Sequence, residues 1–203
     1  MAYPVSFSAD YGSGDRSRGL AVLGIIWLKG LLLIPHAIIL FFVYLAALFV
    51  GWIGYFVVLF TGKRLPDGIQ NFIANTIGWM QRLQAWMYSL TDAYPPFEFD
   101  PASYGVQFAV TDDNPDRNRW LALSGILSLK WILAIPHLIV IWALSIGVAI
   151  AGWIGYWIIA FTGQANQGIH EFIEGVTRWT GRVLAWVAGL TDEYPPFSLD
   201  VDG

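Results

Sequence analysis

Two long stretches of the chain carry almost no charge. No residue between Lys29 and Lys63 is formally charged, and the stretch from Lys130 to Glu171 is interrupted only by His137 and His170. Each stretch exceeds the ~20 residues needed to cross the ~30 Å hydrocarbon core of a bilayer. The segments 36–60 and 137–161 lack the polar stripe of a soluble core helix. The pattern predicts two apolar helices that lie among lipid chains.

The chain repeats itself at about half its length. The matching segments are rich in Pro, His, Gly, Trp and Asp, which chance similarity between two apolar helices would not reproduce. The clearest pairs are Ile34-Pro35-His36 with Ile135-Pro136-His137, Gly51-Trp52-Ile53-Gly54-Tyr55 with Gly152-Trp153-Ile154-Gly155-Tyr156, and Tyr94-Pro95-Pro96-Phe97 with Tyr194-Pro195-Pro196-Phe197. The boundary falls near Asp100, which predicts a first membrane repeat over residues 1–100 and a second over residues 101–203.

Each repeat predicts the same order of elements. A short alternating strand (residues 5–9 and 106–110) precedes a helix that runs to about Leu33 or Ala134, where a proline interrupts it. A second helix ends at Phe-Thr-Gly, where Gly62 or Gly163 suits a left-handed cap. A third helix covers residues 67–90 and 167–190. The Tyr-Pro-Pro-Phe segment leads into another strand, and residues 97–99 are expected to form a hairpin with residues 106–110.

Charge placement predicts the topology. The arginines and the lysines of the loops flank the apolar segments, so the first two helices of a repeat enter and return on one side as a hairpin. The first helix is short for a full crossing, so the hairpin either spans the bilayer or dips into it. The two repeats are then parallel, related by an axis along the membrane normal, with both termini cytoplasmic. Lys29 and Lys130 lie inside apolar runs, and we expect them to snorkel from a hairpin tip at the Pro-His corner. The third helix has a polar stripe and an aromatic face, which is typical of an interfacial helix. The alternative is a helix that packs on a soluble β-element.

Composition narrows the class of protein. Apolar residues make up 56% of the chain and charged residues 13%, about half the share in a soluble domain. The absence of Cys excludes a disulfide scaffold, and a net charge of −4 without a basic cluster excludes a nucleic-acid partner. The predicted fold class is an all-α integral membrane protein of the cell membrane, with helical hairpins, interfacial amphipathic helices, a small β-element and an internal tandem duplication.

The order Ile-Pro-His, Phe-Thr-Gly and Thr-Asp-x-Tyr-Pro-Pro-Phe resembles a bacterial membrane-domain family of unknown function. The resemblance covers nearly the whole chain, once per repeat, and implies no activity or catalytic residue. One loop departs from the pattern: Lys63-Arg64 follows the first Phe-Thr-Gly, whereas Gln164-Ala165-Asn166-Gln167 follows the second.

His36 and His137 are the candidate cofactor ligands, because paired imidazoles in a membrane repeat can hold a haem iron. The alternative is that each satisfies backbone groups at its proline corner. Lys29 and Lys130 can instead form a polar track through the bundle. Asp92 and Asp192 are more typical of turn caps than of catalytic acids. The sequence therefore predicts no catalytic residue, no metal site and no cofactor.

Two further sets of residues are candidates for contacts. The glycines Gly51, Gly54, Gly152 and Gly155 allow close helix packing. The rigid aromatic segments dock a partner or, alternatively, clip the third helix to the strands; their residues are Tyr94, Pro95, Pro96 and Phe97, and Tyr194, Pro195, Pro196 and Phe197. The leading hypothesis is a non-catalytic accessory subunit or self-assembling membrane scaffold, a homo-oligomer or member of a membrane complex. The alternatives are a small transporter or channel, and a haem- or quinone-binding redox subunit.

Overall fold

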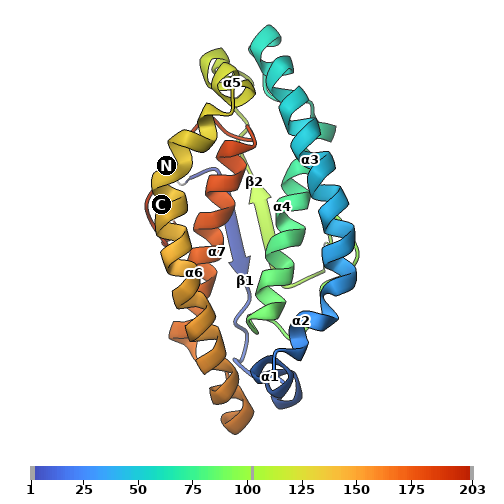
Figure 1. Ribbon diagram of the computed structural model, residues 1–203, viewed down its shortest axis with the longest axis vertical. Helices are drawn as coiled ribbons and strands as arrows, with labels where there is room; N and C mark the ends of the chain where they lie inside the picture. Colours follow the sequence, from blue (N-terminus) through green and yellow to red (C-terminus); the bar gives the residue numbers. More distant parts are fainter. Residues whose placement is uncertain (1–2, 102, 202–203) are drawn as a thin grey trace.

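A computed structural model describes residues 3–101 and 103–201 and is mostly helical (Figure 1). Both halves have the same order of elements if α2 and α3 of the first half are taken together as the counterpart of α6 in the second, which agrees with the predicted duplication. The first half contains β1 (Val5–Ala9), α1 (Arg18–Ile25), α2 (Leu28–Leu32), α3 (Ile34–Thr61) and α4 (Asp67–Met87). The second contains β2 (Val106–Val110), α5 (Arg119–Ile126), α6 (Leu129–Thr162) and α7 (Gln167–Val187). The two long apolar helices are α3 and α6.

The elements form three layers. α3 packs on α4 and α6 packs on α7, while α4 and α7 contact each other and rest on the two strands. The third helices therefore pack on the β-element, which agrees with the alternative to an interfacial position. In Figure 1, α3 runs upward and α6 runs downward, so the long helices are antiparallel. The two halves are therefore related by a pseudo-two-fold axis perpendicular to the long helices. Two parallel hairpins would require parallel long helices, so the predicted parallel arrangement is wrong.

The small sheet joins the two halves. β1 pairs with β2 in antiparallel register, with Phe7 opposite Phe108, and Val5, Phe7 and Ala9 are buried as their alternation predicts. The hairpin predicted between residues 97–99 and 106–110 is wrong. Residues 97–99 form no strand, because Arg82 Nη2 donates to the carbonyl oxygens of Glu98 and Phe99 at 2.7 and 3.2 Å.

The first predicted helix breaks earlier than its proline. Trp27 and Ser128 adopt left-handed backbone angles, with φ of 64° and 59°, and the chain turns there. Pro35 lies in the first turn of α3, where its missing N–H is tolerated, and Pro136 lies inside α6. The hairpin tip expected at the Pro-His corner is therefore wrong, because the chain passes through that corner without reversing.

The short helices are exchanged between the halves. α1 packs against α6 and α5 packs against α3. Gly24 of α1 lies against the ring of Tyr156, and Gly125 of α5 lies against the ring of Tyr55. Each tyrosine hydroxyl then donates to a carbonyl at the end of the other half's third helix, Met87 for Tyr156 and Val187 for Tyr55. These contacts fix the two halves in one body.

Candidate functional site

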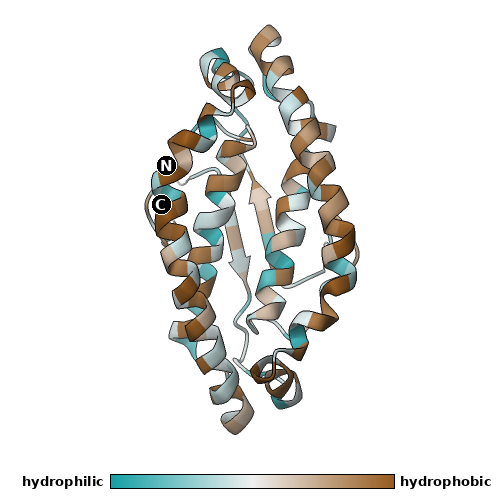
Figure 2. Ribbon diagram, viewed as in Figure 1, coloured by the Kyte–Doolittle hydropathy of each residue, from teal (hydrophilic) through white to brown (hydrophobic). Residues whose placement is uncertain are grey.

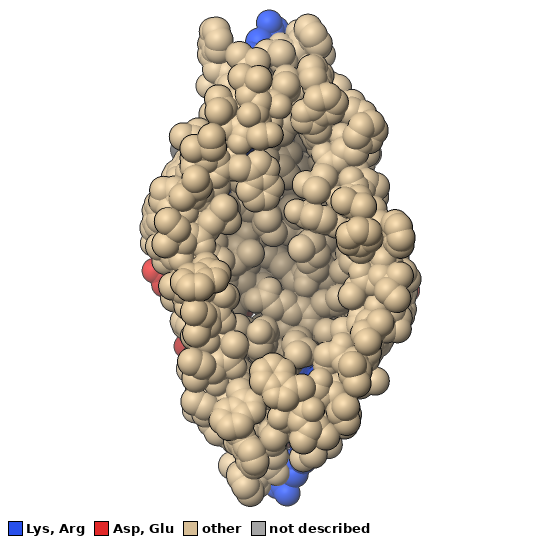
Figure 3. All heavy atoms as spheres, viewed as in Figure 1, with Lys and Arg blue, Asp and Glu red and all other residues tan. Residues whose placement is uncertain are grey.

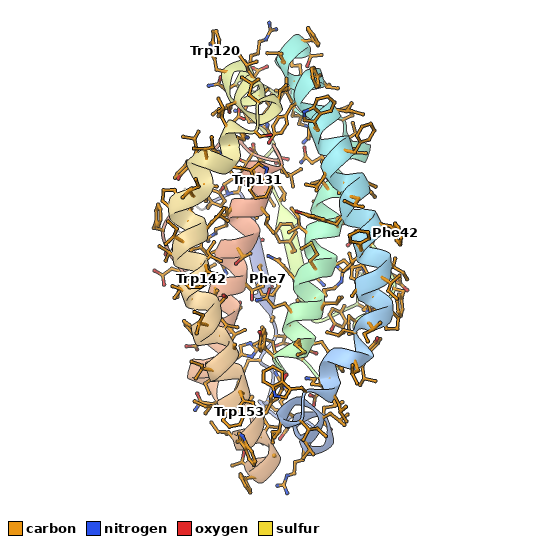
Figure 4. The ribbon with its side chains drawn as sticks, in the orientation of Figure 1. Phe7, Phe42, Trp120, Trp131, Trp142 and Trp153 are labelled. Atoms are coloured by element: carbon orange, nitrogen blue, oxygen red, sulfur yellow. The ribbon has the colours of Figure 1, made fainter. Side chains whose placement is uncertain are left out.

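Apolar residues predominate along α3 and α6 (Figure 2), and many of their large side chains are exposed. Trp142, Phe42, Phe49 and Ile139 are 69%, 65%, 62% and 62% exposed, and Figure 4 shows Phe42 and Trp142 on opposite flanks. Both helices are long and apolar enough to cross a membrane, and only 22% and 17% of their most apolar 18-residue segments is buried. A soluble core helix would be mostly buried. We call this surface the apolar face.

Cations lie at the two tips of the apolar face (Figure 3). Arg119 Nη2 donates to the Thr61 carbonyl at the end of α3, and Arg18 Nη2 donates to the Thr162 carbonyl at the end of α6. Both arginines thus occupy helix C-termini, which favour positive charge. Lys63 pairs with Asp116 at 2.6 Å on the surface of the first tip. The remainder of the face in this view is nearly free of charged side chains.

A cavity of about 140 Å³ opens on the apolar face between α3 and α7. Figure 3 shows the hollow between the long helices, and Figure 4 shows Trp131 pointing toward it. Gly51, Ile73 and Val187 belong to its buried walls, whereas Leu48 and Trp52 are 44% and 46% exposed at its mouth. An apolar lining of this kind suits hydrocarbon rather than water.

The two imidazoles form equivalent aromatic clusters. Trp79 Nε1 donates to His36 Nδ1 and Trp179 Nε1 donates to His137 Nδ1, each at 3.0 Å. Both rings are fully buried. Because Nδ1 accepts the indole N–H, the neutral ring carries its proton on Nε2, and neither nitrogen offers a free lone pair to a metal. This geometry favours the structural interpretation of His36 and His137 over haem ligation.

The Tyr-Pro-Pro-Phe segments complete these clusters. Phe97 stacks on His36 with ring centroids 3.7 Å apart, and Phe197 stacks on His137 at 3.8 Å. Tyr94 Oη donates to the Leu32 carbonyl at 2.7 Å, on the helical turn before Pro35. The Pro-His and Tyr-Pro-Pro-Phe motifs thus form one contact, which supports the clip interpretation. Tyr94 and Phe97 remain 43% and 50% exposed, so a partner can still reach them.

The two lysines that lie inside apolar runs are buried. Lys29 Nζ donates to the Trp86 carbonyl at 2.6 Å and to Ser89 Oγ at 3.0 Å, and Lys130 Nζ donates to the Trp186 carbonyl at 2.8 Å. Their side chains are 0% and 1% exposed, so the expected snorkelling is wrong. Each ammonium instead satisfies carbonyl groups at the end of a third helix, where the helix dipole favours a cation. Burial lowers the pKa of Lys29 to about 8.

The two aspartates of the Thr-Asp motif cap the short helices. Asp92 Oδ2 accepts from the Ser17 backbone N–H at 2.5 Å, and Asp192 Oδ2 accepts from that of Asn118 at 2.6 Å. Ser17 and Asn118 are the N-caps of α1 and α5. A carboxylate at a helix N-terminus is stabilising, which favours the turn-cap interpretation.

The four repeated glycines of the long helices face inward. Gly51 lies near Ile73, Gly54 near Leu65 and Ile69, and Gly155 near Ile169. Gly152 lies in close contact with the ring of Tyr88. These positions bring α3 and α6 close to the third helices of the same chain, so the glycines are not available on the outer surface for association between copies.

The sequence reasoning missed three sets of partners. These are the tryptophans that bond the histidines, the tyrosines that join the two halves, and the arginines that bind helix-end carbonyls (Arg16 on Ser89 and Leu90, Arg117 on Leu190). Each set occurs once in each half at matching positions, and that recurrence was the available signal. Among residues 3–101 and 103–201, no group of three or more His, Cys, Asp or Glu gathers as a metal site.

The fold and the apolar face define a helical protein with a tandem duplication. The model of the family described as a domain of unknown function, DUF4389, matches residues 25–98 and again residues 126–198. These matches cover most of the chain, so it belongs to this family and carries two copies of the domain. The resemblance inferred from the motifs is thereby confirmed. No curated protein and no solved structure gives a significant match.

Proposed function

We propose that this chain is a non-catalytic membrane protein that lies along one leaflet of the cell membrane and serves there as an accessory or scaffold protein. The observation that carries the proposal is the apolar face, which the two long helices form. The more polar third helices and the strands lie on the opposite side of these helices. In this arrangement α3 and α6 rest among the acyl chains, parallel to the bilayer plane. The strands and the Tyr-Pro-Pro-Phe segments face the aqueous phase.

The opposite side of the molecule argues against spanning. The two-stranded sheet has two outer edges, and open sheet edges are not tolerated against lipid. Ser6, Ser8 and Gln107 are exposed on these strands, which lie beside the midpoints of the third helices. A spanning orientation would place them at the bilayer centre. The 34 residues of α6 also extend about 51 Å, well beyond the ~30 Å hydrocarbon thickness.

The placement of charge is compatible with the same orientation. The arginines at both tips of the apolar face suit the anionic headgroups of a single leaflet. The pseudo-two-fold axis then lies along the membrane normal, and both halves present equivalent surfaces to the lipid.

The polar groups that other functions would use have structural partners. A transport path through Lys29 and Lys130 would have to break their bonds to helix-end carbonyls. Coordination of a redox centre by His36 Nε2 would require the ring proton to move to Nδ1, which accepts the Trp79 indole N–H. These contacts support an accessory or scaffold role over the transporter and redox alternatives, whose tests are ion flux in proteoliposomes and a visible absorption band.

Vesicle flotation tests the proposed attachment. We expect the purified protein to float with phospholipid vesicles after detergent removal, and Phe42→Glu combined with Trp142→Glu to reduce partitioning about tenfold or more, because both side chains enter the acyl region. Ser6→Glu with Ser8→Glu, on the sheet, is the matched control and should float normally. A protein that is monodisperse without detergent and stays at the bottom of the gradient would contradict the proposal.

Light scattering tests the scaffold role separately. We expect the protein to exceed the mass of one chain in mild detergent, through either self-association or a retained partner. A bare monomer that also remains monomeric in vesicles would contradict self-assembly and leave only the accessory role.

A further inference from the structure

One difference between the two halves bears directly on the cavity of the apolar face. Ala85-Trp86 matches Ala185-Trp186, so Tyr88 corresponds to Ala188. The Tyr88 ring lies in close contact with Gly152 and packs beside a core cluster that includes Val148. At the corresponding place in the cavity, Ala188 leaves the space beside Gly51 open.

The chemistry of the cavity selects a hydrocarbon ligand. Its walls include Ala47, Ile73, Ile77 and Val187, all buried. The buried hydroxyl of Thr76 is already bonded to the Phe72 carbonyl at 2.7 Å. An engineered apolar cavity of about 150 Å³ stays dry and binds benzene. A volume of about 140 Å³ therefore accepts the end of one hydrocarbon chain and not a whole lipid.

The mouth of the cavity indicates where that chain comes from. Trp52, Leu48 and Trp131 surround the opening and are 46%, 44% and 38% exposed. They belong to α3 and α6, the helices whose exposed side chains form the apolar face. A ligand that enters between them arrives from the environment of that face.

We propose that this cavity binds the tail of one membrane lipid. The inference rests on the proposed function, because the leaflet against the apolar face supplies the tail. Binding occurs in the first half of the long-helix layer only, since Tyr88 occupies the equivalent space in the second. The molecule thus holds one lipid tail on one side of its pseudo-two-fold axis, so the tail breaks the symmetry of the two halves.

Photolabelling tests the site. The probe is palmitic acid with a diazirine near its methyl end, added to the protein in detergent, and labelled peptides are mapped by mass spectrometry. We expect labels in residues 73–80 and 184–188. Ala188→Tyr places at this position the residue that the other half has, and it should reduce this labelling about tenfold or more. Tyr88→Ala should create a second labelled region around Gly152.

A second probe and a second cavity-filling variant complete the experiment. A phosphatidylcholine that carries the same diazirine tail shows whether the lipid is a phospholipid or a free fatty acid. Gly51→Leu fills the cavity from α3 if Ala188→Tyr fails to fold. Labelling that spreads evenly over exposed α3 and α6, and that neither filling variant changes, would overturn the proposal.

Flotation separates the two proposals. If wild type and Ala188→Tyr both float but neither gives site-specific labelling, the tail site is wrong and the membrane attachment stands. If neither floats, the attachment itself fails.

Discussion

At the scale of single residues, the motifs that define the repeat are explained by one another. His36 accepts a hydrogen bond from the Trp79 indole N–H and stacks on Phe97. These contacts explain why the Pro-His motif occurs in both halves. The sequence identified the histidines and the Tyr-Pro-Pro-Phe segments as significant. It did not show that they meet, since they lie some sixty residues apart in each half and only tertiary packing brings them together.

Lys29 predicts a pH dependence of stability. Burial lowers its pKa to about 8 from an ordinary value of 10.5. Between these values the unfolded chain holds a proton that the folded chain has lost, so stability rises with pH and the gain is lost as pH falls to 8. From pH 7.5 to 9.5 we expect the free energy of unfolding of wild type to rise by about 2 kcal/mol relative to Lys29→Met.

Denaturant unfolding of both proteins in the same detergent measures this difference. The tyrosines and Lys130 titrate equally in the two proteins and cancel. Parallel pH profiles of wild type and Lys29→Met would show that the ammonium is not buried as described.

At the scale of elements, local signals located the helices and strands but not their partners. The left-handed caps at Gly62 and Gly163 have φ of 69° and 78°, and they end α3 and α6 where Phe-Thr-Gly predicted. The turn at Trp27 was not predictable in this way, because a tryptophan carries no preference for a positive φ. The pairing of β1 with β2 and the exchange of short helices depend on contacts between residues far apart in the sequence, which no local pattern encodes.

The exchange of short helices predicts a contrast between two glycines of α1. A methyl group at Gly24 would overlap the Tyr156 ring, whereas one at Gly19 would meet only Ser17 Oγ, at 3.7 Å. We expect Gly24→Ala to destabilise the protein by about 2 kcal/mol and Gly19→Ala to leave stability unchanged or raise it by up to about 1 kcal/mol. Thermal unfolding in detergent measures both. Equal effects would contradict the packing of α1 on α6.

At the scale of the whole molecule, the sequence indicated lipid contact but not orientation. Two apolar stretches of spanning length fit either a helix across the bilayer or one along it, and the flanking charges are compatible with both. The antiparallel arrangement of α3 and α6 distinguishes the two cases. If the helices span the bilayer, the C-terminal ends of α3 and α6 lie on opposite sides of it. If the helices lie in the membrane plane, both C-terminal ends are on the same side.

Cysteine labelling tests the orientation directly, because the chain contains no native cysteine. Gly68 and Gly168 are equivalent exposed positions, and they begin α4 and α7 at opposite ends of the molecule (Figure 1). In intact cells we expect an impermeant maleimide to label neither Gly68→Cys nor Gly168→Cys, and to label both after permeabilisation, because both tips face the cytoplasm. Ile139→Cys on the apolar face should stay unlabelled in either condition, since a thiol among acyl chains does not ionise. Labelling of one glycine position alone in intact cells would mean that the long helices cross the bilayer, and the orientation along one leaflet would be wrong.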